Sequence, residues 1–541
     1  MRRANPFFTP SLPAVARYVF TNLSVRATHS GVRFIDLVQT SAAVAATSGR
    51  NKKVELIAHR LRELAPDERA IAARYLSGQV PQKTGIGYAT VGELRDVPPA
   101  ADPTLTIADV DRGFTEIAAM AGTGAGRGRK ERFGGLLARA TQLEQGFLGA
   151  LSVGELRQGA LDALVVDAIG KAAELAVATL RTAYMLAGDL GEVAAAALEG
   201  GAAEIGRFGL TLFRPVMPML AQTADDAASA LAALGGEAAL ELKLDGFRVQ
   251  IHKDGDEVRV YSRNLNDVTR VVPEVVDAVR TLPARRLIFD GEAIAFSPEG
   301  RPRPFQDTMR RFGRRDDPAL RAAIPLSLSV FDALLIDDQL MLGVPARTRF
   351  AAIAELAPAV SVPRVVATDP VAATAFYNDA IARGHEGVMA KALDAPYDAG
   401  NRGAAWLKIK KVRRLDLVVL AAEWGSGRRK GWLSNLHLGA RDASAGFVML
   451  GKTFKGMTDR MLAWQTAELL AREVDRDGHI VFVRPELVVE VAFNDVLRSP
   501  HYPGGLALRH ARIVRYRDDK TAAESDTIDA VRAIAITDGV L

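Results

Sequence analysis

The chain has 541 residues, more than one hydrophobic core supports, so roughly two to four domains are expected. It contains no cysteine, which excludes disulfides, cysteine-ligated zinc and thiol nucleophiles and is typical of a reducing cytosol. The net charge of +5 is weak evidence for nucleic-acid binding, because residues 1–31 carry four arginines and no acid, leaving +1 for the rest.

Residues 1–31 show neither helical nor strand periodicity and are expected to form a disordered extension. An ordered extra helix, or upstream sequence before the true start, are the alternatives. Pro10, Pro13 and Arg17 interrupt the apolar stretch, so a signal peptide is not expected. No apolar run reaches the roughly 20 residues of a membrane helix, and no membrane association is predicted.

Residues 32–205 follow a helical pattern. Apolar residues recur at helical spacing between Val54 and Leu64, and Pro66 ends that run. Capping-box patterns predict helix starts at Thr106 and at Ser152. We therefore expect an all-α domain over this range.

The glycine- and arginine-rich stretch 122–130 lies inside this helical range. It lacks the G-x-x-x-x-G-K-[ST] spacing of a P-loop, and no strand precedes it as a dinucleotide-binding fingerprint requires. The sequence favours a flexible loop that contacts phosphate through Arg127, Arg129 and Lys130.

The periodicity changes near residue 212. Alternating residues from Phe247 to Ile251, a turn at Gly255 and a returning strand predict a hairpin. Further strands are predicted at Leu287–Ile294 and Leu326–Leu335, with helical stretches between them. Residues 212–412 are thus expected to form one α/β or α+β domain.

Residues 413–541 are predicted to be mostly β, with glycine- and arginine-containing turns between strands. The predicted strands are Leu415–Ala421, Ser434–Gly439, Ile480–Val483 and Leu487–Phe493. A small Greek-key barrel of the OB type fits this pattern.

The strongest chemical signal is Lys243, which precedes Asp245-Gly246 in a K-x-D-G setting. An amine can take a nucleotide from a triphosphate and pass it on, which activates a phosphate for joining. Alone, this lysine could be an exposed strand residue before a turn. Downstream motifs change that balance: Ser262-Arg263-Asn264, Asp290-Gly291-Glu292, Phe331-Asp332, Glu386 to Lys391, Trp406 to Lys411, and Arg509 to Lys520.

This ordered set resembles the nucleotidyltransferase motifs of ATP-dependent DNA ligases, and the resemblance covers residues 32 to about 535. It implies that Glu241 accepts a hydrogen bond from the adenine amino group and that Phe331 stacks on the base. Arg248, Arg263 and Glu292 would hold the ribose and the nearby phosphate. Taken singly, Phe331 could be ordinary core and Glu292 a strand carboxylate paired with an arginine.

Charge considerations extend the predicted site. Transfer at phosphorus requires cations around the phosphates and a metal holder. Lys408 and Lys410 share one face of a strand and could both reach the α-phosphate, although a solvated basic strand end is the alternative. Glu386 offers a hard oxygen ligand for Mg²⁺, with Glu292 as a second candidate ligand. Asp245 is expected to orient Lys243 and the attacking hydroxyl.

The resemblance also implies roles outside the central domain. Arg517, Asp519 and Lys520 would orient the pyrophosphate leaving group. Arg157 and Gly159 resemble a minor-groove segment, and Lys452 and Lys455 a DNA-facing hairpin.

We therefore predict an enzyme that uses ATP and Mg²⁺ to seal nicks in double-stranded DNA through a lysyl-AMP and a DNA-adenylate. It is expected to be a monomer in the bacterial cytoplasm, associated with the nucleoid. An RNA ligase or capping guanylyltransferase shares several motifs but would not need the helical domain. An NAD-dependent ligase would carry a cysteine zinc site, and a catalytically dead scaffold would have lost a motif lysine.

Overall fold

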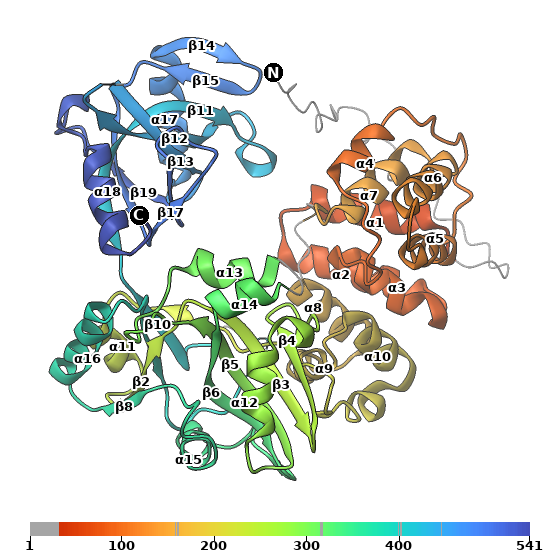
Figure 1. Cartoon of the computed structure of the whole chain (residues 1–541). Helices are drawn as coiled ribbons and strands as arrows, with labels where there is room; N and C mark the ends of the chain where they lie inside the picture. The colour runs from red at the N-terminus through yellow and green to blue at the C-terminus, as the bar shows by residue number, and fades with distance from the viewer. Residues whose placement is uncertain are drawn as a thin grey trace. The chain divides into compact units, whose positions relative to one another are not determined.

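A computed structural model describes residues 32–156, 158, 162–313, 317–398, 400, 403–444 and 446–541. The chain divides into two compact units, Met1–Val216 and Met217–Leu541 (Figure 1). The predicted extension 1–31 and the predicted DNA contacts Arg157 and Gly159 lie outside the described residues.

The described part of the first unit is helical, as predicted. Its core is formed by the apolar faces of these helices, including Phe34, Ile57, Phe114 and Val165, which are completely buried. The helices are α1 (Phe34–Ala46), α2 (Arg50–Glu63), α3 (Pro66–Ser77), α4 (Tyr88–Glu93), α5 (Ile107–Ala119), α6 (Ala125–Ala138), α7 (Gln142–Ser152), α8 (Asp162–Ala173), α9 (Val177–Ala187) and α10 (Leu190–Ile205).

One of the two predicted helix starts is correct. Thr106 caps α5, since its Oγ1 accepts a hydrogen bond from the Asp109 backbone at 3.1 Å. The start predicted at Ser152 is wrong, because Ser152 is the last residue of α7. That helix begins instead at Thr141, whose backbone N–H donates to the buried carboxylate of Glu144.

The predicted phosphate loop at 122–130 is also wrong over most of its length, because α6 begins at Ala125. Gly124, with φ of +87°, precedes the helix in the left-handed region that glycine adopts easily. Arg127 pairs with Glu131 one turn later, and Lys130 pairs with Glu93. Burial of Phe133, Leu136 and Leu137 against the rest of the unit offsets the low helix propensity of the glycines.

The second unit begins with a part built on two sheets. The first sheet has the strand order β1-β10-β9-β2-β8 and the second β4-β3-β5-β6-β7. The strands are β1 (Gln222–Thr223), β2 (Ala238–Lys243), β3 (Phe247–Asp254), β4 (Glu257–Ser262), β5 (Arg286–Ala295), β6 (Leu326–Ile336), β7 (Gln339–Leu340), β8 (Arg364–Ala367), β9 (Gly387–Lys391) and β10 (Trp406–Lys410). Neighbouring strands are antiparallel except β1 and β10, so the α+β alternative is the correct one.

Helices cover these sheets and complete two separate cores. The helical elements are α11 (Ala227–Ala233), η2 (Thr269–Val271), α12 (Pro273–Arg280), α13 (Phe305–Gly313), α14 (Pro318–Ala323), α15 (Ala346–Leu356) and α16 (Pro370–Ala382). Helices α11 and α16 pack on the first sheet, and α12 packs on the second. The predicted hairpin is confirmed as β3 and β4, with Gly255 at φ of +57° in the turn.

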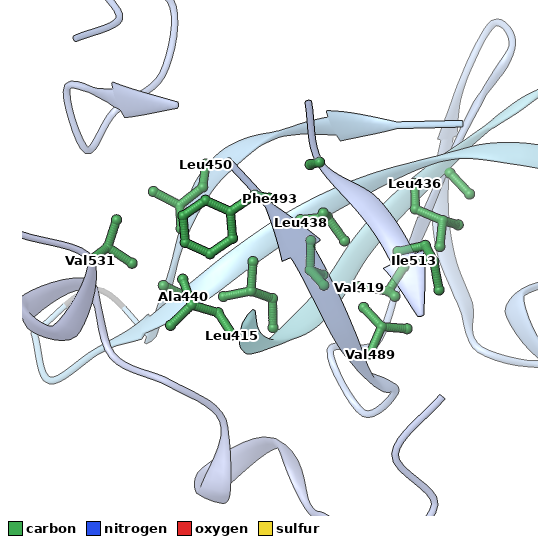
Figure 2. Close-up of a cluster of buried hydrophobic side chains, with 14 of the residues drawn as sticks. Leu415, Val419, Leu436, Leu438, Ala440, Leu450, Val489, Phe493, Ile513 and Val531 are labelled. Carbon is green, nitrogen blue, oxygen red and sulfur yellow. The ribbon is translucent and has the colours of Figure 1, made fainter. Parts of the chain in front are cut away.

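The C-terminal part contains a seven-stranded antiparallel sheet with its own core (Figure 2). Its strands are β11 (Arg413–Trp424), β12 (Leu433–Asp442), β13 (Gly446–Thr453), β14 (Glu473–Asp477), β15 (Ile480–Val483), β16 (Val488–Phe493) and β19 (Arg512–Tyr516). A small hairpin of β17 (Val496–Arg498) and β18 (Leu506–Leu508) accompanies η3 (Gly427–Arg429), α17 (Asp459–Ala471), η4 (Ala522–Glu524) and α18 (Ile528–Thr537). All four strands predicted here are present, and we refer to residues 413–541 as the C-terminal sheet domain.

Among the described residues, every helix is too short or too polar to span a membrane.

Candidate active site

Lys243 lies at the end of β2, where strand register brings three charged side chains together. Both Lys243 and Lys410 lie opposite Gly387 of the central strand β9, one on each side. Gly387 has φ of +150°, and a Cβ at this position would collide with the carbonyl group of Ile409. The two lysines therefore flank a position without a side chain, and Glu386 directly precedes it.

Glu386 joins the two lysines. One carboxylate oxygen accepts a hydrogen bond from the Lys243 ammonium and the other accepts one from Lys410. The Lys243 side chain is 17% exposed and that of Glu386 5%. Burial alone would raise the pKa of Glu386, but the two neighbouring ammonium groups lower it below its ordinary value. We call Lys243, Glu386 and Lys410 the Lys243 cluster.

Glu292 approaches Lys243 from the second sheet. Its Oε1 accepts a hydrogen bond from the Gly246 backbone at 3.1 Å, and a Cβ on Gly246 would lie 2.5 Å from the Ala293 carbonyl oxygen. This glycine allows the K-x-D-G turn to lie directly on β5. Burial raises the pKa of Glu292 to about 8, although Lys243 and Arg248 oppose that shift.

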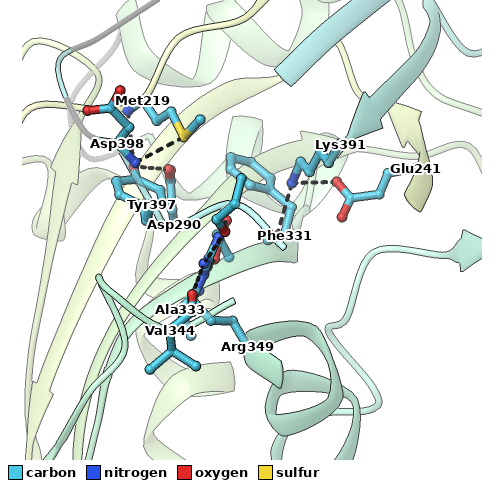
Figure 3. A network of polar contacts seen from close by, with 12 residues as sticks. Met219, Glu241, Asp290, Phe331, Ala333, Val344, Arg349, Lys391, Tyr397 and Asp398 are labelled. Atoms are coloured by element: carbon cyan, nitrogen blue, oxygen red, sulfur yellow. Dashed lines mark hydrogen bonds and ion pairs between the residues drawn. The ribbon is translucent and has the colours of Figure 1, made fainter. Parts of the chain in front are cut away.

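Glu241 lies two residues before Lys243, so the two side chains point to the same face of β2. Its carboxylate is paired with Arg364 of β8 and Lys391 of β9. The Phe331 carbonyl oxygen accepts a hydrogen bond from Lys391 at 3.1 Å (Figure 3). We call Glu241, Arg364 and Lys391 the Glu241 cluster.

A second buried network supports Phe331 and Arg248. Arg248 donates to both carboxylate oxygens of Asp290, at 3.0 and 2.6 Å, and its guanidinium lies 5.4 Å from the Phe331 ring centroid. Tyr397 donates to Asp290 at 2.6 Å (Figure 3). Asp332 receives two hydrogen bonds from Arg349, and both side chains are fully buried.

The remaining nucleotide-site predictions lie in different surroundings. Lys408 donates to the Ala221 carbonyl oxygen at 3.3 Å, whereas Lys410 on the same strand face reaches Glu386. Arg263 is exposed directly after β4. Asp245 accepts hydrogen bonds from Arg509.

The three predicted pyrophosphate-orienting residues are engaged within the C-terminal sheet domain. Arg517 and Lys520 both donate to Oδ2 of Asp416, at 2.8 and 2.6 Å. Arg517 also donates to both carboxylate oxygens of Asp519. We call Asp416, Arg517, Asp519 and Lys520 the Asp416 cluster.

The predicted DNA-contacting lysines of this domain lie at the end of β13. Lys452 pairs with the Glu423 carboxylate on β11, although its own side chain is 37% exposed. Lys455 is exposed in the following turn, and its backbone N–H donates to the Thr453 hydroxyl.

The sequence patterns assign no function to several residues that the structure places in the site. Lys391 ends the predicted Glu386–Lys391 motif, and its position in a buried strand was the available signal that it needs an anionic partner. Arg364 and Arg349 lie outside the motifs. Since no periodicity marks the partner of a buried carboxylate, only the fold brings them to Glu241 and Asp332.

The carboxylates near Lys243 suit a magnesium ion that is held partly by protein and partly by substrate phosphates. Among the described residues, no group of three or more acidic, histidine or cysteine side chains could hold a metal by itself. Mg²⁺ is often bound by one or two carboxylates together with substrate phosphates. Glu386 meets that requirement better than Glu292, whose raised pKa favours the neutral form at pH 7.

Comparison with known proteins identifies related families over most of the chain. Residues 218–410 match the family described as ATP dependent DNA ligase domain, and residues 429–520 match ATP dependent DNA ligase C terminal region. Residues 88–170 match DNA ligase N terminus.

Curated relatives align with this chain over nearly its whole length. A probable DNA ligase of Anaeromyxobacter dehalogenans (strain 2CP-C) is 58% identical over 92% of this chain and 99% of its own. A probable DNA ligase of Mycolicibacterium gilvum (strain PYR-GCK) is 53% identical over 92% and 98%. The solved structure named Pmar-Lig_Pre is 18% identical, with a TM-score of 0.59 over 89% of this chain and 99% of that one, which shows a shared fold.

Proposed function

We propose, since the chain belongs to the ATP-dependent DNA ligase family, that Lys243 is the nucleophile with which it seals nicks in duplex DNA. The observation that carries this proposal is the Lys243 cluster. It unites an amine, a second cation and a carboxylate at the end of a strand face on which Glu241 lies two residues before Lys243.

The reaction would proceed in three transfers. The Lys243 ammonium first loses a proton to solvent, and its Nζ then attacks the α-phosphorus of ATP. An N–P bond forms, and the bond from the α-phosphorus to the oxygen bridging to the β-phosphate breaks to release pyrophosphate. The 5′-phosphate of the nick then displaces Lys243 from AMP. Finally the 3′-hydroxyl loses its proton, attacks the activated 5′-phosphate and releases AMP.

The side chains around Lys243 would each bind part of the nucleotide. Lys410 and Lys408 would stabilise negative charge on the α-phosphate oxygens, and Arg248, Arg263 and Glu292 would hold the ribose and phosphate. Glu386 holds Lys243 in position and would hold Mg²⁺ together with the phosphates. When bound, that ion would neutralise charge on the phosphates.

We propose a division of labour between three domains, with approximate bounds 32–205, 212–412 and 413–541. The separate apolar cores on either side of residue 412 support the last boundary. The C-terminal sheet domain would be an OB fold. It would bring Arg517, Asp519 and Lys520 to the pyrophosphate in the first step and contact the duplex afterwards.

DNA binding would rely on the phosphate backbone and the minor groove. Lys452 and Lys455 at the end of β13 are exposed enough to reach phosphate. On α6, Arg127 and Lys130 are held in surface ion pairs that a phosphate could replace. We further propose that the protein acts as a monomer in the bacterial cytoplasm, in replication, repair or recombination.

Intact-protein mass spectrometry tests this function directly. Incubation with ATP and Mg²⁺ should add one AMP to the protein, and nicked duplex DNA should then remove it while the nick is sealed. Peptide mapping should locate the adduct on Lys243. An adduct on another residue would refute the assignment, and absence of an adduct despite sealing would refute covalent transfer.

A further inference from the structure

The Glu241 carboxylate is almost saturated by two cations. Its Oε1 accepts hydrogen bonds from Nε and Nη2 of Arg364, and its Oε2 pairs with Nζ of Lys391 at 2.7 Å. A carboxylate offers about four acceptor sites. These three contacts therefore leave room for about one more donor.

The same two cations also hold the backbone of Phe331. Its carbonyl oxygen accepts from Lys391 at 3.1 Å and from Arg364 Nη2 at 3.4 Å. Figure 3 shows Lys391 between the Glu241 carboxylate and the Phe331 carbonyl. Glu241 on β2 and Phe331 on β6 belong to different sheets, so this bridge fixes their relative positions.

Aromatic rings enclose both cations. The Arg364 guanidinium lies 3.7 Å from the Phe350 ring centroid, and the Lys391 ammonium lies 4.2 Å from that of Trp406. Cations over aromatic faces are attracted to the ring, most strongly where water is excluded. The enclosure leaves the two cations few alternative positions, so Glu241 is held rigidly.

We propose that Arg364 is a positioning residue that sets the selectivity of this enzyme for adenine over 6-oxo purines. The inference rests on the proposed function and on the expected placement of the base against Glu241 and Phe331. Adenine presents a 6-amino donor, which the remaining acceptor site of Glu241 can bind. Hypoxanthine and guanine present a carbonyl acceptor there, and two acceptors facing each other in a buried site repel.

Loss of Arg364 would weaken this discrimination in a specific way. With only Lys391 left to hold it, the Glu241 carboxylate could rotate or admit water, and the site could then tolerate a 6-oxo group. A site organised to hydrogen-bond one substrate group strongly rejects analogues that lack that group. Losing this organisation should therefore lower the selectivity more than the rate of nucleotide transfer.

Arg364 suits substitution better than its neighbour. It lies on β8 at the edge of its sheet with 12% of its side chain exposed, whereas Lys391 lies on an inner strand with 1% exposed. Arg364→Met keeps an aliphatic stem against Phe350 and removes the charge. Arg364→Lys keeps the charge but loses the two-pronged contact with Oε1.

The matched control is Arg347→Met. Arg347 also pairs with two carboxylates, but these are Asp394 and Glu237 rather than Glu241, and its side chain is half exposed. The full-length parent, both Arg364 variants and this control would be compared for transfer from ATP and from inosine triphosphate. Single-turnover rates of adduct formation would give kcat and KM for each nucleotide.

For Arg364→Met we expect the ratio of kcat/KM for ATP to that for inosine triphosphate to fall at least about tenfold, with Arg364→Lys intermediate. The rise in KM for ATP should exceed the fall in kcat. Arg347→Met should match the parent. Calorimetric affinities for both nucleotides, measured in a Lys243→Ala background, should show the same loss of preference without any turnover.

Equal losses for both nucleotides in Arg364→Met would show a merely structural role and overturn the proposal, as would an unchanged ratio. If Arg364→Met fails to fold, an unchanged ratio in folded Arg364→Lys overturns it equally. A parent enzyme that forms no adduct with ATP would instead refute the proposed function, so the two failures are distinguishable.

Discussion

The enzyme holds its functional charges in two contrasting arrangements. In the Glu241 cluster, the ion pairs run between adjacent strands and the side chains of Glu241 and Lys391 are 2% and 1% exposed. In the Asp416 cluster, Arg517 and Lys520 follow the last strand and share one oxygen of Asp416. Arg517 and Asp416 are 14% and 11% exposed, but Lys520 is 31% and Asp519 60% exposed. The first arrangement fixes one geometry, and the second lets cations change partner.

The difference follows from solvation. Breaking a buried pair leaves an ion that water cannot reach, so the pair stays closed. A partly exposed pair is screened and contributes little, so another anion can replace the carboxylate. Buried pairs suit a base-binding site that must be the same in every turnover. The more exposed pairs, Lys520–Asp416 and Arg517–Asp519, would suit the proposed role of these cations in a single step.

Lys243, beside the buried arrangement, should give the largest effect. Lys243→Ala should abolish both the AMP adduct and nick sealing, because the other lysine of the Lys243 cluster, Lys410, does not stand in a K-x-D-G setting. Lys243→Arg should do the same, since it keeps a positive charge near Glu386 but supplies no nucleophilic amine. The measurements are intact mass after ATP and Mg²⁺ and sealing of nicked duplex. Both variants should still bind duplex DNA, and an undiminished adduct in either would contradict the assignment.

Substitution of Arg349 measures directly how much a buried ion pair stabilises the fold. Arg349→Met leaves Asp332 buried without its partner and should lower the free energy of unfolding by about 3–5 kcal/mol. Denaturant titration of the full-length protein would measure the change. The half-exposed Arg347→Met is the control and should leave the unfolding midpoint close to that of the parent. Similar midpoints for Arg349→Met and Arg347→Met would remove the physical basis of the contrast.

Asp519 and Lys520 test whether the exposed arrangement serves only one step. Replacing both with Ala should slow adduct formation on Lys243 by about 100-fold, because the pyrophosphate would lose its orienting groups. Sealing of a pre-adenylated nick should stay within about tenfold of the parent, since no pyrophosphate remains to be positioned. Single-turnover rates from one preparation give both values, with the exposed neighbour Asp518→Ala as control. Equal losses in both reactions would place these residues in a shared step.

The sequence predicted the parts of the site that depend on local patterns. The K-x-D-G turn identified Lys243, and the motif around Glu386 identified a carboxylate that the structure places in contact with it. Alternation along the strands predicted β3 and β4, and strand-like stretches predicted β11 and β16. Each of these features is encoded within a few residues, so it can be recognised in the sequence without knowledge of the fold.

The parts that were missed depend on distant pairing. Arg364 lies 123 positions from Glu241, and no local pattern links them. The stretch around Arg127 was predicted as a loop from its glycines, but the pairing of Arg127 with Glu131 and burial of Phe133 stabilise helix α6. Composition predicted the propensity of that segment correctly, and tertiary packing overrode it.

Substitution of Glu423 should give the smallest effect. It separates strand register from solvent exposure as the cause of the contrast, because Glu423 combines pairing between strands with a partly exposed partner. Its partners Asn435 and His437 lie on the adjacent strand β12, as in the buried clusters, whereas Lys452 lies one strand further, on β13, and is exposed. The hydrogen bond with His437, followed by those from Lys452 and Asn435, lowers the pKa of Glu423 to about 2, against burial. Because the folded-state pKa lies below the ordinary value near 4.5, the stabilisation is complete above about pH 5 and is lost as the pH falls toward 2.

Glu423→Gln should therefore destabilise the protein by about 1 kcal/mol at neutral pH, a small value because solvent screens its pair with Lys452, which is 37% exposed. The difference from the parent should shrink between pH 5 and pH 3, as unfolding midpoints across that range would show. Glu257→Gln, which removes an exposed strand carboxylate paired with Arg259, should show no such convergence. If the Glu423 effect instead approaches that of Arg349→Met, register between strands matters more than exposure in holding charges. A loss of about 1 kcal/mol in the free energy of unfolding that disappears as the pH falls would show that solvation causes the contrast between the Glu241 and Asp416 clusters.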